Sequence, residues 1–190
     1  MKKVLILDNY DSFTYNLVQI VEEVLGQKID VFRNDAIELA AVDAYEWIIL
    51  SPGPGLPDEA GILKALIDQY GASKKILGVC LGMQAIGEVY GSSLRNLDRV
   101  FHGVQTEVSQ TDNTSPIFSG LEKSFAVGRY HSWVISKDSL VDDLLTTSVD
   151  ASGEIMSVDH SAHKVYGVQF HPESILTPAG KTMIENFLSL

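Results

Sequence analysis

The sequence predicts an α/β fold: an open, mostly parallel sheet with helices on both faces, and antiparallel additions in its second half. Short apolar runs alternate with amphipathic stretches in the first half of the chain, as in strand–helix–strand units. After residue 100 the apolar runs are short and separated by turn residues, which is typical of antiparallel strands. No linker, repeat or low-complexity segment divides the 190 residues, so we expect one domain spanning 1–190.

In the first half, each expected strand is followed by a polar or glycine-rich turn. The first helix repeats apolar residues at helical spacing from Leu17 to Leu25; Asp11 or Ser12 can cap its start, and Gly26 ends it. The other expected elements are strands at Val4–Leu7, Asp30–Arg33, Trp47–Leu50 and Lys75–Val79, and helices at Gly61–Tyr70 and Met83–Tyr90.

The second half supplies the expected antiparallel additions and a last helix from Pro178 to Phe187. In open parallel sheets, ligands bind beyond the carboxyl ends of the strands. Three polar or glycine-rich segments fall at such ends: Asp8–Ser12, Ser51–Gly55 and Cys80–Gly82. The expected additional strands are Val104–Val108, Ser124–Val127, Thr146–Val149, Ile155–Val158 and Val165–Phe170.

Composition and charge narrow the classes of function. The formal net charge is -11 with no cluster of Lys or Arg, so we expect no nucleic-acid binding. The single cysteine excludes an internal disulfide. The first apolar run stops at Asp8, too early for a signal peptide, and no run approaches the ~18 apolar residues of a membrane helix. We therefore expect a cytoplasmic protein without membrane contact.

The strongest local motif is Gly78-Val79-Cys80-Leu81-Gly82, which has the form G-x-C-x-G between an expected strand and an expected helix. A nucleophile elbow has this form, because a strained turn there raises the reactive atom above the sheet. The helix N-terminus favours a thiolate. The alternative is a small buried cysteine at a strand end.

A second motif, Gln169-Phe170-His171-Pro172-Glu173-Ser174, follows the apolar run Val165–Phe170. Residues two apart in an extended segment share a face, so the Glu173 carboxylate can lie beside the His171 ring. It would fix the tautomer and leave the other ring nitrogen free to take a proton from sulfur. The alternative is a strand-end histidine that simply bonds a neighbouring acid.

The third motif, Ser51-Pro52-Gly53-Pro54-Gly55, can expose backbone N–H groups for an oxyanion hole, with the Leu81 N–H as second donor. A plain tight turn is the alternative reading. His160 and His163 have H-x-x-H spacing, but they fall in a polar turn without a third ligand, so no metal site is expected.

Together these motifs resemble the class I, triad-type glutamine amidotransferases. Among them the chain is most similar to the glutaminase subunits, component II, of anthranilate synthase and aminodeoxychorismate synthase. The similarity extends over Leu7–Asn16, Leu50–Gly55, Gly78–Gln84, Arg129–Trp133 and Gln169–Thr177. The segment Asp8–Asn16 marks the chorismate-using subfamily, and we expect it to be a docking surface.

The resemblance implies a flavodoxin-like amidotransferase fold and a reaction without cofactor or metal. Cys80 would be the nucleophile and His171 and Glu173 would complete the triad. L-Glutamine would be hydrolysed through a γ-glutamyl thioester, and a chorismate-binding synthase subunit, component I, would receive the ammonia in a heteromeric complex. The implied oxyanion and substrate-binding residues are Gly53, Gly55, Leu81, Gln84, Ser132 and Trp133.

Two residues depart from the family pattern. Met83 stands where the subfamily often has histidine, and Trp133 stands where leucine is usual. The exchange at Trp133 matters little if the contact there is made by the backbone, but it affects the affinity for glutamine if the side chain lines the pocket.

Other readings stay open at this stage. A flavodoxin-like binding module would need a phosphate loop after the first strand, where Asp8–Ser12 has no glycine. A cysteine peptidase or γ-glutamyl hydrolase would use the same elbow. The sequence also leaves open whether the ammonia serves tryptophan synthesis, folate synthesis or both.

Overall fold

The computed structural model describes residues 2–190 and has a nine-stranded sheet at its centre. The strand order is β2-β1-β3-β4-β11-β10-β9-β6-β7. Five neighbouring strands are parallel: β2 (Asp30–Arg33), β1 (Val4–Asp8), β3 (Trp47–Leu50), β4 (Lys75–Val79) and β11 (Val165–Val168). The others are antiparallel: β10 (Ile155–His160), β9 (Leu144–Asp150), β6 (Val104–Gln110) and β7 (Ser124–Arg129).

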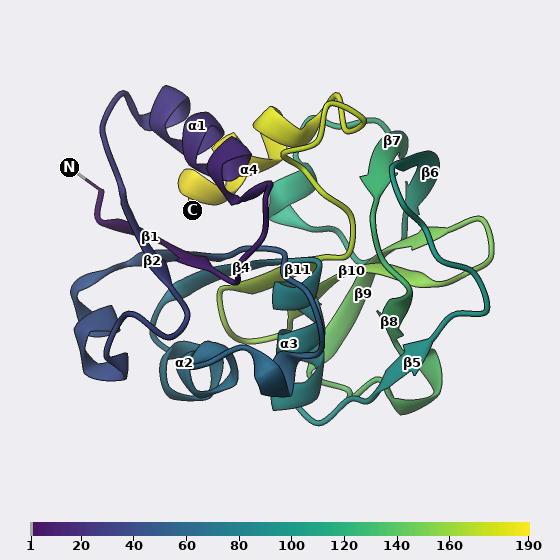
Figure 1. Ribbon diagram of the computed structural model, residues 1–190. Helices are drawn as coiled ribbons and strands as arrows, with labels where there is room; N and C mark the ends of the chain where they lie inside the picture. The colour runs from purple at the N-terminus through teal and green to yellow at the C-terminus, as the bar shows by residue number, and fades with distance from the viewer. Residues whose placement is uncertain (1) are drawn as a thin grey trace.

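Helices cover both faces of the parallel part, which confirms the predicted fold class (Figure 1). On one face lie α1 (Thr14–Leu25) and α4 (Gly180–Leu188), and on the other lie α2 (Leu63–Tyr70) and α3 (Leu81–Val89). The central strands bury both faces, as parallel strands between helix layers must. Consecutive residues of β1, such as Ile6 and Leu7, therefore belong to two separate apolar clusters.

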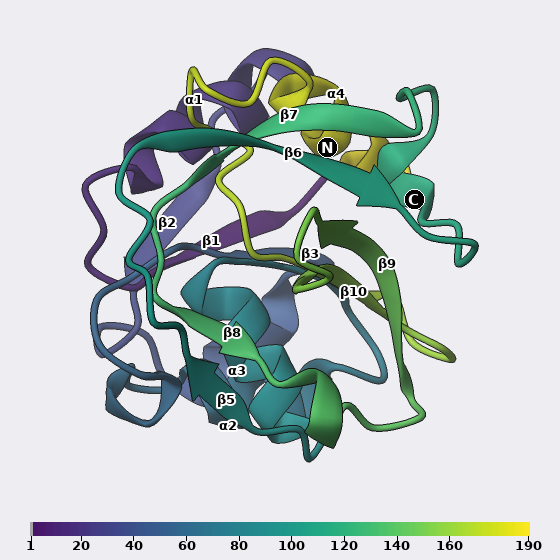
Figure 2. The ribbon, with the colours of Figure 1, turned by 90° about the vertical axis from the view of Figure 1, so that its right-hand side faces the viewer.

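A second, two-stranded sheet was not predicted. It pairs β5 (Leu94–Asn96) with β8 (Trp133–Ile135) and lies beside α3 (Figure 2). Three-residue strands carry too short a pattern to be recognised in a sequence. The short 3₁₀ helices of the chain are η1 (Leu39–Ala44), η2 (Pro57–Glu59), η3 (Pro116–Phe118) and η4 (Lys137–Ser139).

Two local expectations need correction. The run Val165–Phe170 was expected among the antiparallel additions, but β11 is parallel to β4 and antiparallel only to β10. The first helix begins at Thr14 after Phe13, and neither Asp11 nor Ser12 caps it; the Asp11 carboxylate instead accepts the Phe13 N–H. Its predicted end is confirmed, because Gly26 has the left-handed φ of 64° that favours glycine.

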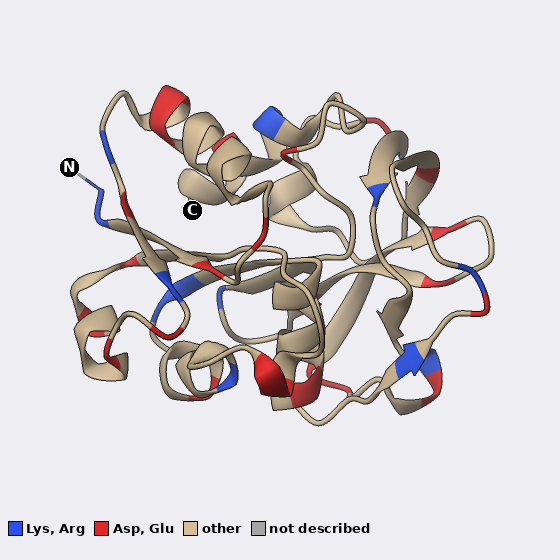
Figure 3. Cartoon of the chain, in the orientation of Figure 1, with Lys and Arg blue, Asp and Glu red and all other residues tan. Residues whose placement is uncertain are grey.

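Charged side chains are distributed widely over the described residues. In Figure 3 the Lys and Arg positions are scattered along the chain among Asp and Glu positions. No helix within residues 2–190 is long and apolar enough to cross a membrane.

Candidate active site

Cys80 occupies a sharp turn between β4 and α3. Its φ of 52° and ψ of -101° are unusual for a residue with a side chain, as expected for a nucleophile elbow. Two glycines allow this turn: a Cβ on Gly78 would lie 2.5 Å from the Gly82 carbonyl carbon, and one on Gly82 would lie 2.7 Å from Leu50 O. The residues of the motif are therefore required by close backbone packing.

The second motif places its histidine and glutamate side by side, but in a turn and not in the expected extended segment, since the Ser174 N–H donates to His171 O. His171 Nδ1 lies 2.7 Å from Glu173 Oε1, and both side chains are buried. The main chain of His171 is fixed as well, since its N–H donates to Gly128 O and its carbonyl accepts from the Thr177 hydroxyl. The ring is thus held from two sides, which is the orienting arrangement of a catalytic histidine.

His171 prefers to be charged in this environment. Burial by itself lowers the pKa of the imidazole, but hydrogen bonding and charge from Cys80 and Glu173 outweigh it and raise the pKa to about 10. A raised histidine pKa beside a thiol favours the thiolate–imidazolium pair. Nε2 makes no aligned hydrogen bond within the described residues, so it remains available to a reacting group.

The proline- and glycine-rich loop packs tightly against the elbow. A Cβ on Gly53 would lie 2.5 Å from Asn9 O and 2.7 Å from Leu81 Cδ2, so only glycine fits there. Gly55 has a φ of 72°. Leu81 is the first residue of α3, where a backbone N–H has no partner within the helix. Gly53 thus lies close to Leu81, the residue that directly follows Cys80, where an oxyanion donor is expected.

A pocket of about 360 Å³ opens beside these groups, a volume typical of small-molecule sites. Six of the residues predicted for the site line it: Gly53, Gly55, Cys80, Gln84, Ser132 and Trp133. Leu81, His171 and Glu173 do not line it. Pro54, Leu56, Tyr130 and His131 complete the lining.

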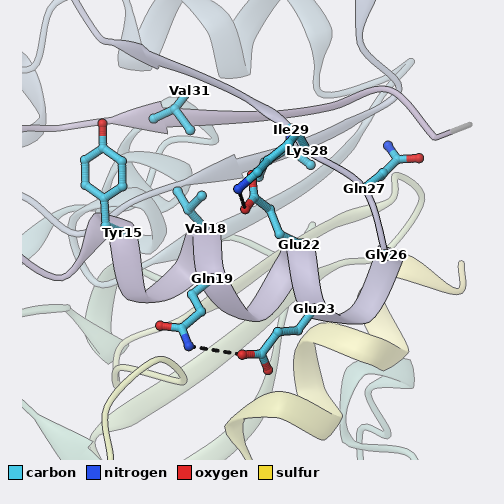
Figure 4. Close-up of a pocket in the computed structure, with 10 residues that line it drawn as sticks. All are labelled: Tyr15, Val18, Gln19, Glu22, Glu23, Gly26, Gln27, Lys28, Ile29 and Val31. Carbon is cyan, nitrogen blue, oxygen red and sulfur yellow. Dashed lines mark hydrogen bonds and ion pairs between the residues drawn. The ribbon is translucent and has the colours of Figure 1, made fainter.

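A larger hollow of about 720 Å³ lies along α1 and β2 (Figure 4). Tyr15, Val18 and Val31 line it together with the ion-paired Glu22 and Lys28. It contains none of the predicted site residues, so volume alone does not identify the reaction site.

The backbone of Trp133 organises one wall of the pocket. Its carbonyl accepts from Gln84 Nε2 at 3.1 Å and lies 3.0 Å from His131 Nδ1. Arg129 Nε, which can only donate, lies 3.0 Å from His131 Nε2, so Nδ1 must carry the ring proton. Burial and the Arg129 charge lower the pKa of His131 to about 3, which keeps this ring neutral.

Several residues of the site were missed by sequence reasoning. Arg129 is fully buried, pairs with Asp150 at 2.8 Å and stacks on Phe101. Phe13 and Tyr130 flank the His171 ring with centroid distances of 5.9 and 4.8 Å. All three lie in segments that carry the family resemblance, but their contacts join segments distant in the sequence, so spacing alone could not predict them.

The segment Asp8–Asn16 is more structural than predicted. Asn9 is buried: its N–H donates to the Ser51 hydroxyl and its Nδ2 donates to Ser51 O. The Asp8 carboxylate accepts from Tyr10 N and the Thr14 hydroxyl. Two aromatic side chains of the segment remain exposed, Tyr10 at 49% and Tyr15 at 68%.

Met83 lies away from the pocket. It is fully buried on the face of α3 that packs on β11, where a Cβ on Gly167 would lie 2.8 Å from Met83 Cγ. Its departure from the family pattern therefore changes a core contact.

Comparison with known proteins identifies the family of this chain. The family model described as "Glutamine amidotransferase class-I" matches residues 5–190. The chain belongs to the class I glutamine amidotransferases. The resemblance inferred from the sequence motifs is thereby confirmed, and so is the class of enzyme.

The relatives of this amidotransferase include subunits of two synthases. It is 46% identical over 188 residues to anthranilate synthase component 2 of Lactococcus lactis, covering 98% of this chain and 93% of that one. It is 44% identical over 187 residues to aminodeoxychorismate synthase component 2 of Escherichia coli, covering 97% and 98%. A third relative, the bifunctional protein TrpGD of Thermotoga maritima, is 42% identical over 193 residues, and the chain spans 32% of its length.

A solved structure supports the same fold. A protein of Thermoplasma acidophilum that is described as part of a putative GMP synthase superposes with a TM-score of 0.88 at 28% identity, covering 100% of this chain and 93% of that one.

Proposed function

We propose that this amidotransferase hydrolyses L-glutamine through a γ-glutamyl thioester on Cys80 and passes ammonia to a separate chorismate-binding synthase subunit, component I, in a heteromeric complex. One observation carries the catalytic part: Cys80, at a strained φ of 52°, lines a pocket of about 360 Å³ and acts together with Glu173 to keep the His171 ring charged. Relatives named as component 2 of anthranilate or aminodeoxychorismate synthase support the partner.

The reaction begins with a proton already on His171. The Cys80 thiolate attacks the side-chain amide carbon of glutamine, and the C=O electron pair moves onto oxygen. The Leu81 N–H and the Gly53–Gly55 backbone stabilise that charge, each donor contributing about 3 kcal/mol by analogy with other oxyanion holes. His171 then gives its proton to the leaving nitrogen, and ammonia departs.

In hydrolysis of the thioester, proton transfer at His171 runs in the opposite direction. Neutral His171 accepts a proton from water, the hydroxyl oxygen bonds to the acyl carbon, and the C–S bond breaks to give glutamate and the thiolate. Glu173 keeps Nδ1 protonated throughout, which directs Nε2 to each transfer.

Gln84, Ser132 and Trp133 would bind the amino-acid end of glutamine, since they line the pocket around Cys80. The Trp133 carbonyl is already used by Gln84 and His131. Hence at this position the backbone contributes to the shape of the site, in line with tolerance of tryptophan in place of leucine.

Tyr10 supports a partner surface at the edge of the sheet where Cys80 lies, because both residues follow the carboxyl ends of parallel strands. It is one of two non-glycine residues with positive φ within residues 2–190, the other being Cys80. Its exposed ring lies under the Arg33 guanidinium, and its hydroxyl donates to the Asp35 carboxylate. Strain of this kind is retained where function needs it, so we assign Tyr10 to docking of the synthase partner.

Both synthases occur among the relatives, so two pathways are supported: component 2 of anthranilate synthase, or component 2 of aminodeoxychorismate synthase, with dual use as a third arrangement. We place the protein in the cytoplasm, where a single reduced cysteine can serve as nucleophile.

Labelling with an electrophilic glutamine analogue tests the catalytic proposal. We expect the analogue to modify Cys80 faster than iodoacetamide does, and glutamine to protect it, because the pocket would hold the reactive carbon beside the sulfur. Equal rates for the two reagents without protection by glutamine would reject a glutamine pocket. Release of ammonia from glutamine, against cleavage of peptides, separates this activity from a peptidase.

A further inference from the structure

The Gln84 amide has a defined orientation in the pocket wall. A backbone carbonyl can only accept, so the group facing Trp133 O at 3.1 Å must be Nε2. The same Nε2 lies 3.2 Å from Gln169 Oε1, so its second hydrogen is directed to Gln169. Both donors of Gln84 are therefore used inside the protein, and its Oε1 is the atom left for a ligand.

The orientation of the Gln84 amide also fixes the orientation of the Gln169 amide. Because Gln169 Oε1 accepts from Gln84, the opposite end of its amide carries the hydrogens, and this Nε2 lies 3.5 Å from Cys80 Sγ. The sheet register explains the contact: Val168 pairs with Val79, so Gln169 and Cys80, which directly follow β11 and β4, lie side by side. The Gln169 side chain is fully buried, so no water competes for its donor.

We propose that Gln169 is a further catalytic residue, which donates an N–H to the Cys80 sulfur in a direction set by the relay Trp133 O–Gln84–Gln169. This proposal rests on Cys80 as nucleophile and adds a role to a residue outside the triad. A hydrogen bond to a charged sulfur is stronger than one to a neutral thiol, so the relay favours the thiolate.

The relay acts at two points of the cycle. Before attack it holds the thiolate beside the pocket. During hydrolysis the acyl carbon gains a bond to the water oxygen, the C–S bond breaks, and its electron pair returns to sulfur. The Gln169 N–H receives that developing charge together with the imidazolium. Removing the donor should therefore slow both formation of the thiolate and breakdown of the thioester.

The pH profile of Cys80 alkylation by iodoacetamide, followed by mass spectrometry on the purified chain, tests the relay. For Gln169→Leu we expect a midpoint moved to higher pH by about one unit, about tenfold slower alkylation at pH values below the wild-type midpoint, and the wild-type rate at the high-pH plateau. Gln169→Glu should move the midpoint further, because a carboxylate would face the thiolate. Gln110→Leu is the matched control, because the Gln110 side chain only donates to Glu122 O; its alkylation profile should coincide with that of the wild type.

Profiles of Gln169→Leu and Gln169→Glu that both coincide with wild type would overturn the proposal. An equal fall at every pH, plateau included, would also overturn it, because that result indicates altered access. Circular dichroism checks that each variant is folded; if the leucine variant does not fold, the glutamate variant decides alone by the same criteria.

Failure of the relay is distinguishable from failure of the proposed function. A wild-type profile in the Gln169 variants, together with glutamine-protected labelling of Cys80, removes only the relay. Absence of glutamine-protected labelling in the wild-type chain removes the function itself.

Discussion

The charge on the His171 ring can be tested with the substitution Cys80→Ala. Burial alone would lower the pKa of this imidazole, while Cys80 and Glu173 raise it from 6.5 to about 10. At about 1.4 kcal/mol per pKa unit, that rise corresponds to about 5 kcal/mol of preference for the protonated ring in the folded chain. Removing the sulfur leaves burial opposed by Glu173 only, so we expect the pKa of His171 to fall by at least about 1 unit.

The assay is an NMR titration of the histidine ring nitrogens in the wild type and in Cys80→Ala. The other four histidines serve as internal references. Stability gives a second readout with a defined sign. A raised histidine pKa stabilises the fold fully below pH 6.5, and this contribution is lost as the pH rises through about 10. We therefore expect Tm to fall over that window in the wild type, and to fall less in Cys80→Ala.

Two results would refute the reasoning. A wild-type pKa near 6.5 would mean that the thiolate–imidazolium pair does not form. An unchanged pKa near 10 in Cys80→Ala would mean that Glu173 alone charges the ring and that the sulfur has no part in it.

Three further predictions concern the triad, the elbow and the partner surface. His171→Asn should lower glutaminase turnover more than Glu173→Gln in steady-state assays, because the histidine moves protons while the glutamate orients it; equal small losses would indicate another base. Gly82→Ala should lower the free energy of unfolding by about 1–3 kcal/mol in urea titrations, because its Cβ would lie 2.7 Å from Leu50 O; unchanged stability would contradict that packing. Tyr10→Ala should weaken binding of the synthase partner and lower the turnover that it stimulates, measured by titrating the partner; wild-type affinity would remove Tyr10 from the interface.

Local motifs predicted the part of the site that local geometry creates. The elbow needs only a strand, a turn with close glycines and a helix. The strand and helix patterns on either side of Gly78–Gly82, and the glycines within it, are all visible in the sequence. The His171–Glu173 contact likewise joins residues two apart in the sequence, although a turn brings them together and not the extended segment that was expected. In the elbow and in the His171–Glu173 pair, the residues that meet are close in the sequence, so their proximity in space could be predicted.

Contacts across the sheet could not be predicted in this way. The direction of β11 depends on how the chain returns through β9 and β10, and the turn residues around it do not reveal this. The contact of Gln169 with Cys80 requires that direction and the register with β4. Asn9 was expected at a docking surface because a polar residue at a strand end can face solvent. Instead it forms hydrogen bonds with Ser51, which directly follows the neighbouring strand β3.

The central claim is that Cys80 serves ammonia production alone and that another chain uses the ammonia. Cys80→Ser, in complex with the synthase partner, tests it by comparing product formation from glutamine with product formation from added ammonium salts. We predict that glutamine-dependent synthesis is abolished while ammonium-dependent synthesis stays close to that of the wild type, because serine lacks the thiolate and the synthase site is untouched. Equal loss of both activities, or full activity with glutamine, would contradict the account.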